Sequence, residues 1–510
     1  MREATRDAAD HIALVSVGPD RNPRSWTYRQ LLDDSERAAA WLLARYRSGE
    51  HIAVWAPNVP EWIVLQYGAA LAGLVLVTAN PAWREAELEY ALRRSHAVGM
   101  FHVDGFRGTD MAEIVDAVLP RVPQVRGATS FGGWLDEVRR TERPTTLPEV
   151  HPGSPTQIQF TSGTTGAPKA AVLAHMAMVT NAAYVHERSG SPDGATWLTA
   201  LPLFHTAGCG LAGMGTVYQR GTLVLAEVFD PALMLTAAQQ FRAQVLSGVP
   251  AMLHAVLAHP DLHTYDLAAL RIVTSGGDAV PAELIDRCEQ QFGTVFSAVY
   301  GQTELSPIIC QTGPEDGRED NRFTAGRPLP NVEVAIVDPL TGTVVPTGTE
   351  GEICARGYQQ MLGYLDMPAE TAATVDAHGR LRTGDLGTMD DRGYVRVTGR
   401  LKDMIIRGGE NIYPREIEVA LGRHPAVIQA VALGLPDARW GETVAAALRL
   451  DPAQPVPSAQ DLQRFLRESL APHKTPKSWF AATALPVNAM GKLQKFRLRE
   501  QILAGELSEL

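Results

Sequence analysis

The peptide Phe160-Thr-Ser-Gly-Thr-Thr-Gly-Ala-Pro-Lys169 stands between two apolar segments and combines hydroxyl side chains, glycines and one lysine. Glycines let consecutive backbone N–H groups converge on an anion, hydroxyls add hydrogen-bond donors, and a lysine adds a full positive charge. The peptide therefore predicts a cradle for a polyphosphate. The residues expected to contact the phosphates are Thr161, Ser162, Gly163, Thr164, Thr165, Gly166 and Lys169.

A flexible linker is the alternative interpretation of such a Gly/Thr-rich segment, and composition alone leaves the two nearly even. The Pro-Lys ending beside the apolar segment from Ala170 to Leu173 favours the cradle. The cradle is not a Walker A loop, because that loop has a glycine directly before its lysine and a Ser or Thr directly after it. Pro168 and Ala170 hold these two positions here.

The composition is that of an acidic globular protein. The chain has 510 residues and a formal net charge of −11. This length exceeds the size at which a single core stops growing, so at least two domains are expected. The acidic balance argues against a nucleic-acid or anionic-membrane partner. The longest apolar stretch, from Ala69 to Val77, is too short to span a bilayer, and no signal peptide is expected at the amino terminus.

The four cysteines are scattered without C-x-x-C spacing. This pattern predicts neither structural disulfides nor a zinc site, and it fits a reducing, cytoplasmic environment. The sequence leaves a monomer and a dimer equally open.

Apolar strands and helices alternate through the first three hundred residues. The segments 51–56, 61–73 and 74–78 read as strand, helix and strand, and further strands are expected at 197–202, 221–226, 244–249 and 271–275. Short connections between such segments predict parallel pairing in a layered α/β domain. From Glu333 onward, short alternating strands predict a smaller β-rich subdomain, and after Lys402 an α+β pattern follows.

Further motifs follow the cradle in order along the chain. They are Tyr300-Gly-Gln-Thr-Glu304, Arg382-Thr-Gly-Asp385, Gly399-Arg-Leu-Lys-Asp403 with Arg407-Gly-Gly-Glu-Asn-Ile-Tyr-Pro414, and Gly491-Lys-Leu-Gln-Lys495. Together with the cradle they resemble the adenylate-forming superfamily, which comprises acyl- and aryl-CoA synthetases, peptide-synthetase adenylation domains and luciferases. The carboxy-terminal motifs are most similar to those of medium-chain acyl-CoA synthetases.

The resemblance implies an α/β fold with a large amino-terminal domain and a small carboxy-terminal domain. The large domain, residues 1–401, would contain layered α/β sheets and a small β-barrel-like subdomain. The mobile α+β domain, residues 402–510, would turn about a hinge at Lys402.

The resemblance also assigns roles in the binding of ATP and Mg²⁺. The cradle would hold the β- and γ-phosphates, Thr303 would contact the α-phosphate, and Glu304 would hold the metal. Asp385 would accept hydrogen bonds from the ribose, and Arg400 would reach the ribose or a phosphate. The adenine would lie against Gly276, Gly277, Tyr300 and Gly301.

Two further motifs, one with Lys492 and one with Gly409, imply which reaction steps the protein performs. Lys492 would bridge the substrate carboxylate and the α-phosphate during adenylation, although an exposed lysine in a basic tail is the alternative. Gly409 would line a tunnel for the pantetheine arm, which favours CoA as the acceptor of the acyl group. Loop glycines also occur for conformational reasons alone.

The resemblance places the acid pocket in four segments of the large domain. The residues carried over are Phe204, His205, Val249, Met252, Asp278, Gln302 and Ser306. Asp278 departs from the small neutral residue that is usual in the family. A buried carboxylate needs a partner, so an amino- or hydroxy-substituted aryl acid is one hypothesis. A partner arginine or an outward turn position is the alternative.

Three classes of function remain at this point. The leading one is an ATP-dependent carboxylic acid–CoA ligase. A second keeps adenylation but changes the acceptor, as in carrier-protein loading or an ATP-dependent diazotase that activates nitrite for an aryl amine. A non-catalytic nucleotide-binding module is disfavoured, because Glu304, Asp385 and Lys492 are all present.

Overall fold

The computed structural model of this chain describes residues 1–161, 168–408, 410–487 and 493–510, and for Asn411 it describes the backbone alone. The chain divides into two compact units. The first contains Met1–Val334 and Ala355–Leu381, and the second contains Ala335–Cys354 and Arg382–Leu510. Each unit has its own sheets and its own core.

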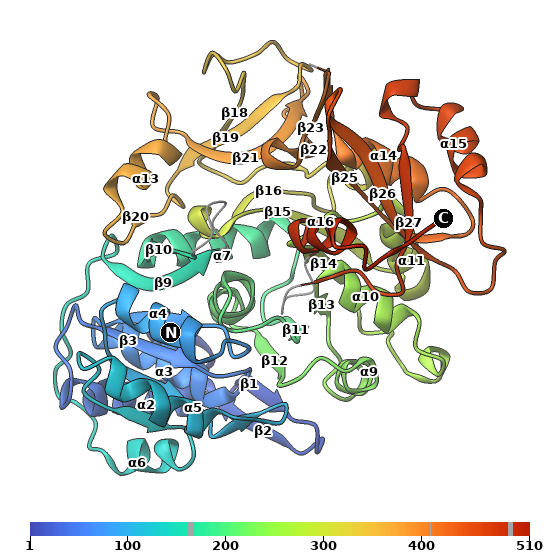
Figure 1. Cartoon of the computed structure of the whole chain (residues 1–510). Helices are drawn as coiled ribbons and strands as arrows, with labels where there is room; N and C mark the ends of the chain where they lie inside the picture. Colours follow the sequence, from blue (N-terminus) through green and yellow to red (C-terminus); the bar gives the residue numbers. More distant parts are fainter. Residues whose placement is uncertain (162–167, 409, 488–492) are drawn as a thin grey trace. The chain divides into compact units, whose positions relative to one another are not determined.

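The first unit contains a nine-stranded mixed sheet in the order β17-β16-β15-β14-β13-β11-β12-β1-β2 (Figure 1). From β15 to β1 every neighbouring pair is parallel. The strands are β1 (Ile12–Val17), β2 (Pro23–Thr27), β11 (Thr196–Thr199), β12 (Thr222–Ala226), β13 (Val245–Ser247), β14 (Ile272–Gly276), β15 (Val295–Gly301), β16 (Ile308–Gln311) and β17 (Arg327–Pro328). The predicted strands at 197–202, 221–226, 244–249 and 271–275 are thereby confirmed.

Three helices cover one face of this sheet: α9 (Pro231–Gln240), α10 (Pro250–Leu257) and α11 (Ala282–Phe292) (Figure 1). Their apolar side chains and those of the parallel strands form one buried cluster. Pro231 and Pro250 each occupy the first turn of their helix, where a missing N–H costs nothing. These helices start directly after the strands that precede them, so the connections at the carboxyl edge stay short.

A second sheet of the first unit has seven strands in the order β20-β10-β9-β4-β3-β5-β8. They are β3 (His51–Trp55), β4 (Val75–Ala79), β5 (Ala97–His102), β8 (Ala128–Ser130), β9 (Pro155–Thr161), β10 (Lys169–Ala174) and β20 (Gly363–Tyr364). The predicted strand–helix–strand pattern at 51–78 is confirmed as β3, α3 (Pro60–Leu71) and β4, with β3 and β4 parallel. Most side chains of α3 are buried, which explains its largely apolar sequence.

The second unit begins with an open four-stranded sheet in the order β18-β19-β21-β22. Its strands are β18 (Val332–Val337), β19 (Gly351–Gly357), β21 (Leu381–Met389) and β22 (Val395–Arg400). The expectation of a barrel-like subdomain is wrong, because in the described part of the chain β18 and β22 form opposite edges and do not close the sheet. The open sheet has a small buried cluster of its own, formed by Ala335, Val337 and Cys354.

A six-stranded sheet forms the rest of the second unit. Its strands are β23 (Ile405–Arg407), β24 (Glu410–Ile412), β25 (Val427–Asp437), β26 (Gly441–Leu450), β27 (Ser478–Ala481) and β28 (Ser508–Glu509). Alternate residues of β25 enter two different buried clusters, Val431 and Leu433 in one and Ala432 in the other. The sheet is therefore covered on both faces, by α14 (Pro414–Leu421) and α15 (Ala459–Arg467) on one and by α16 (Lys495–Leu503) on the other.

The predicted boundary between residues 401 and 402 falls inside the second compact unit. Lys402 is exposed in the short 3-10 helix η5 (Leu401–Asp403), directly after β22. Its role as a hinge stays a prediction, because a hinge is defined by a motion. Within the described ranges, no helix combines the length and the apolar character needed to cross a membrane.

Candidate active site

The predicted phosphate cradle connects the two strands of a β-hairpin. Strands β9 and β10 pair antiparallel, with Thr161 opposite Lys169. Ser162, Gly163, Thr164, Thr165 and Gly166 lie outside the described residues. At the return end of the connection, the Tyr90 hydroxyl donates a 2.9 Å hydrogen bond to the Pro168 carbonyl. This bond, from helix α4 (Glu85–Arg94), fixes where the second strand starts.

Tyr364 connects Lys169 of the cradle with Glu304, the predicted metal ligand. The Lys169 Nζ lies 4.9 Å from the centroid of the Tyr364 ring. The Tyr364 hydroxyl donates a 2.8 Å hydrogen bond to the Glu304 Oε1. Two motifs that are 135 positions apart in the sequence therefore share one tyrosine. Tyr364 was not among the predicted site residues, because it belongs to none of the sequence motifs described above.

The remaining predicted site residues of the first unit lie at one edge of the nine-stranded sheet. Strands β11, β13, β14 and β15 are parallel neighbours, so their carboxyl ends meet at the same edge (Figure 1). Open parallel sheets bind ligands at this edge. The predicted residues that end these strands or belong to the segments after them are Phe204, His205, Val249, Met252, Gly276, Gly277, Asp278, Tyr300, Gly301, Gln302, Thr303, Glu304 and Ser306.

Glycine is required at the predicted adenine site by the packing of the backbone. A Cβ on Gly276 would lie 2.3 Å from the Val299 carbonyl oxygen, and one on Gly301 would lie 1.9 Å from the Pro307 carbonyl oxygen. Gly277 has a φ of +79°, which favours glycine. Close strand packing thus explains these glycines independently of any approach to a flat ring.

Asp278 is exposed, which agrees with the outward turn position and not with the buried carboxylate. Its Oδ1 accepts a 2.8 Å hydrogen bond from the backbone N–H of Ala279, the next residue. This is the geometry of a turn residue that satisfies itself locally. An amino or hydroxyl group on the substrate is therefore not needed to pair with Asp278.

A buried glutamine holds the turn that carries His205. Gln159 of β9 is fully buried, and its Oε1 accepts a 3.0 Å hydrogen bond from the backbone N–H of Thr206. Its Nε2 donates to the Gln157 Oε1 at 2.9 Å and to the Cys209 Sγ at 3.5 Å. Since Gln159 lies two positions before Thr161, one side chain links the cradle strand to the predicted acid pocket.

The π-helix η2 (Ala207–Met214) follows directly after this turn. His186 of α7 (His175–Arg188) packs beneath it, with its Nε2 2.9 Å from the Leu211 carbonyl oxygen and its Nδ1 2.9 Å from the Gln219 Oε1. The His186 ring stacks on Trp197 at 3.8 Å between centroids. Burial lowers the pKa of His186 to about 4, so the ring is neutral at physiological pH.

In the second unit, the two predicted nucleotide contacts pair with each other. Asp385 of β21 and Arg400 of β22 are opposite in register, and the Arg400 Nε lies 2.7 Å from the Asp385 Oδ1. Asp385 is buried in a regular strand and is not a loop residue. This contact with the arginine holds the Asp385 carboxylate in place.

Gly409 and Lys492 lie outside the described residues, but their neighbours are placed. Gly408 has a φ of +61°, and a Cβ there would lie 2.7 Å from the Trp440 Cε3. Val487 and Leu493, which flank the segment with Lys492, form an isolated antiparallel bridge.

The donor set around Glu304 suits a magnesium ion that is bound mainly through phosphate oxygens. Among the described residues, no group of three or more His, Cys, Asp and Glu side chains could hold a metal alone. Mg²⁺ usually takes one or two carboxylates and completes its shell with phosphate oxygens and water. Glu304 supplies one such carboxylate, with Oε1 already oriented by Tyr364.

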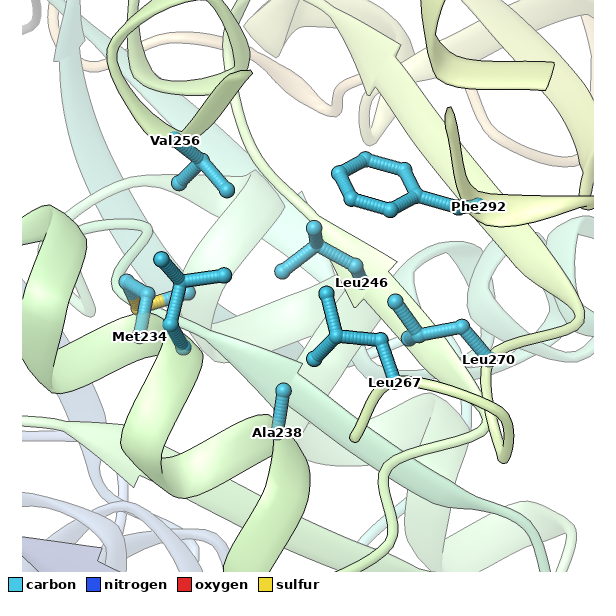
Figure 2. A pocket seen from close by; sticks show the side chains of 8 residues that line it. Met234, Ala238, Leu246, Val256, Leu267, Leu270 and Phe292 are labelled. Atoms are coloured by element: carbon cyan, nitrogen blue, oxygen red, sulfur yellow. The ribbon is translucent and has the colours of Figure 1, made fainter. Parts of the chain in front are cut away.

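A separate apolar pocket lies within the core that the three covering helices form with the sheet (Figure 2). Leu270 precedes β14 and Phe292 precedes β15, so this pocket lies toward the amino ends of the strands. It offers no polar group to a reacting carboxylate, and it is distinct from the carboxyl edge. Its lining residues are Met234, Leu235, Ala238, Leu246, Val256, Leu267, Leu270 and Phe292.

Comparisons with known proteins agree with this arrangement. Residues 1–365 match the family model for AMP-binding enzymes, and residues 416–492 match that for the AMP-binding enzyme C-terminal domain. The chain is 34% identical to the mitochondrial medium-chain acyl-CoA ligase ACSF2 of Bos taurus, over 93% of this chain and 83% of the relative. It is 36% identical to a Rhodococcus jostii CoA ligase named for a dioxo-octahydroindenyl propanoyl group, over 98% of both chains.

Among solved structures, ATP-bound MatB from Rhodopseudomonas palustris superposes with a TM-score of 0.89. The two chains are 28% identical, and the match covers 98% of each.

Proposed function

This chain belongs to the family of AMP-binding enzymes, and on that basis we propose how its residues carry out the reaction. The enzyme is an AMP-forming acid–CoA ligase. It joins a carboxylic acid to the AMP part of ATP and then transfers the acyl group to CoA.

In the first half-reaction, a carboxylate oxygen attacks the α-phosphorus of ATP, the bond to the β-phosphate breaks, and pyrophosphate leaves. Lys169 and the hydroxyls of the cradle hold the β- and γ-phosphates, and Thr303 donates to the α-phosphate. We expect Lys492 to interact with both the carboxylate and the α-phosphate and to neutralise charge on both. Positioned cations and donors suffice here, because the reacting groups need orientation and charge stabilisation and no enzyme nucleophile.

Glu304 is the residue that would hold Mg²⁺, and the ion would neutralise charge on the phosphate oxygens. The placement of Glu304 next to Lys169, through Tyr364, supports this role. Asp385, oriented by Arg400, binds the ribose.

In the second half-reaction, the CoA sulfur attacks the acyl carbon, the bond to the AMP oxygen breaks, and AMP leaves. The connection with Gly409 is the proposed passage for the pantetheine arm. Its neighbour Gly408 has no room for a side chain beside Trp440, which supports a connection of restricted shape.

For the acid we propose a medium-chain aliphatic or a ring-bearing substrate. The printed names of the relatives support both, since one is a medium-chain ligase and the other acts on a propanoyl group with a bicyclic substituent. Both the amino-substituted acid and the aryl-amine acceptor were suggested because a buried Asp278 carboxylate would need a partner. Asp278 is exposed, so this reason no longer applies to either.

One observation carries the proposal. Lys169 of the cradle and the Glu304 carboxylate both contact Tyr364, beside the carboxyl edge of the parallel strands. The test is ATP–pyrophosphate exchange across aliphatic, aryl and bicyclic keto acids, followed by product analysis with CoA. We expect exchange with one class of acid and formation of its CoA thioester. Failure of every acid to release AMP would overturn the proposal, and an adenylate that CoA does not discharge would overturn its second half.

A further inference from the structure

Tyr364 touches two groups of opposite charge in the nucleotide site, and it belongs to no motif that the function has used. We propose that Tyr364 is a positioning residue that keeps Lys169 and Glu304 apart and oriented, so that one stays available for phosphate and the other for a divalent cation. The inference rests on the proposed function and deepens it.

The backbone of Tyr364 is fixed independently of its side chain. Tyr364 pairs with Ala171 of β10, and its N–H donates a 2.9 Å hydrogen bond to the Thr371 Oγ1. The residue that follows, Leu365, donates its N–H to the Ala170 carbonyl at 2.9 Å. Because the segment is held against the cradle strand on both sides, the ring has a defined place relative to Lys169.

The hydroxyl of Tyr364 orients one oxygen of Glu304. It donates to Oε1 at 2.8 Å, which leaves Oε2 for a metal. Tyr364 is only 8% exposed, so water competes little with this hydrogen bond. Carboxylates that bind metals are generally held by such a second hydrogen bond.

The face of the Tyr364 ring holds Lys169. The ammonium lies 4.9 Å from the ring centroid, within the range of a cation–π interaction. Across the described residues, no ion pair joins Lys169 to Glu304. A direct pair would neutralise both charges, whereas contact with a ring and a hydroxyl leaves each charge able to bind its own part of a metal–ATP complex.

Two substitutions separate the two contacts. Tyr364→Phe removes the hydrogen bond to Glu304 and retains the ring that contacts Lys169. Tyr364→Leu removes both contacts. Tyr358→Phe is the matched control, because Tyr358 is a partly buried tyrosine six positions away whose hydroxyl bonds to the Asn181 Nδ2 at 3.4 Å.

The measurement is equilibrium binding to the full-length enzyme without turnover. Mn²⁺ binding is followed by electron paramagnetic resonance in the presence of α,β-methylene-ATP, and binding of the nucleotide without metal is measured by calorimetry. We expect Tyr364→Phe to weaken Mn²⁺ binding about tenfold and to change metal-free nucleotide binding less than about twofold. Tyr364→Leu should weaken both, and Tyr358→Phe neither.

Equal Mn²⁺ affinities in Tyr364→Phe and the wild type would overturn the inference. So would a Tyr364→Phe variant whose metal-free nucleotide binding falls as much as its Mn²⁺ binding, since that is the result of a purely structural role. Thermal unfolding of each variant checks that the fold is retained. These measurements need no acid substrate, so their outcome is separate from failure of the proposed ligase reaction.

Discussion

At the level of single residues, the site depends on a few buried polar side chains that connect distant parts of the chain. Tyr364 joins Lys169 to Glu304, and Gln159 joins the cradle strand to the turn with His205. A buried donor or acceptor that loses its partner costs more free energy than a normal hydrogen bond contributes. Each of these side chains therefore specifies one arrangement of its neighbours.

Gln159→Leu removes the acceptor of the buried Thr206 N–H. We expect it to lower the free energy of unfolding by about 1–3 kcal/mol. It should raise the KM for the acid more than the KM for ATP. The reason is that the turn with His205 moves, while the strands on either side of the cradle keep their pairing and the hydrogen bond from Tyr90. Chemical denaturation and steady-state kinetics measure the two effects.

Gln311→Leu is the matched control for this prediction. Gln311 is equally buried, and its Nε2 donates to the Val185 carbonyl and the Ser297 Oγ, both at 3.0 Å. It should cost similar stability and leave the ratio of the two KM values unchanged. A Gln159→Leu enzyme with the same KM ratio as the control would contradict the positioning role.

At the level of elements, helices and strands meet at junctions that no single element specifies. The π-helix η2 packs on α7 and β11 through His186, which contacts Leu211, Gln219 and Trp197. A Cβ on Gly215 would lie 2.1 Å from the His186 Nε2, so only glycine fits there. The sequence analysis gives no secondary structure for Ala207–Met214, and the contacts of His186 show that the π-helix depends on the residues packed beneath it.

His186 makes stability depend on pH. Its pKa falls from the ordinary value of 6.5 to about 4 in the folded chain, because burial disfavours the charged ring. Between pH 6.5 and 4 the unfolded chain binds a proton that the folded chain does not. The free energy of unfolding therefore falls as pH falls through this window, with a contribution of up to about 1.4 kcal/mol per pH unit, and levels off above pH 6.5.

His186→Asn should reduce that slope in denaturation curves measured from pH 4 to 7, although the variant is less stable overall. His263→Asn, which changes an exposed histidine of the same unit, should leave the slope unchanged. Identical slopes for His186→Asn and the wild type would contradict the assignment.

The connection between β23 and β24 offers a second test at this scale. Gly408→Ala places a methyl group against Trp440 in a left-handed conformation, so the connection with Gly409 must shift. We expect the rate of thioester formation from a preformed acyl adenylate to fall about 10- to 100-fold. Pyrophosphate exchange should stay close to wild type.

Gly422→Ala is the comparison variant, because the nearest atom to its Cβ is 3.4 Å away and its φ is −62°. If Gly408→Ala lowered the rates of pyrophosphate exchange and thioester formation equally, the proposed role of the connection in CoA binding would be contradicted.

At the level of the whole molecule, the chain forms two compact units, and each contains different residues of the proposed active site. The first unit holds the cradle and the parallel-sheet edge, and the second holds Asp385, Arg400 and the segment with Lys492. An enzyme with two half-reactions can use such a division to exchange groups at one reacting centre.

Lys492→Ala tests the dependence on the second unit. We expect AMP formation from acid and ATP to fall about 100-fold or more, because a positioned charge on the developing transition state is lost. Thioester formation from a synthetic acyl adenylate should be much less affected. Lys477→Ala changes an exposed lysine of the same unit, and it should leave both rates unchanged.

Much of the fold and of the site could be predicted from the sequence. The strands at 51–56, 197–202 and 221–226 follow from short apolar runs, and the layered α/β class follows from their alternation with helices. Strand β21 was missed, because the Thr-Gly-Asp within it resembles a turn and only pairing with β22 makes it a strand. Whether Asp278 is buried or lies in an outward turn stayed open, because a turn residue and a pocket residue look alike in the sequence.

The sequence by itself determined the family, the order of the motifs and the chemistry that these residue types can perform, because these depend on residue identity and local spacing. The tertiary structure alone decided that Tyr364 meets Lys169 and Glu304, that Gln159 holds Thr206, and that Asp278 faces outward. The physical reason is that such contacts join residues far apart in the chain, so they arise only when the order of the strands and the packing of the sheets bring them together.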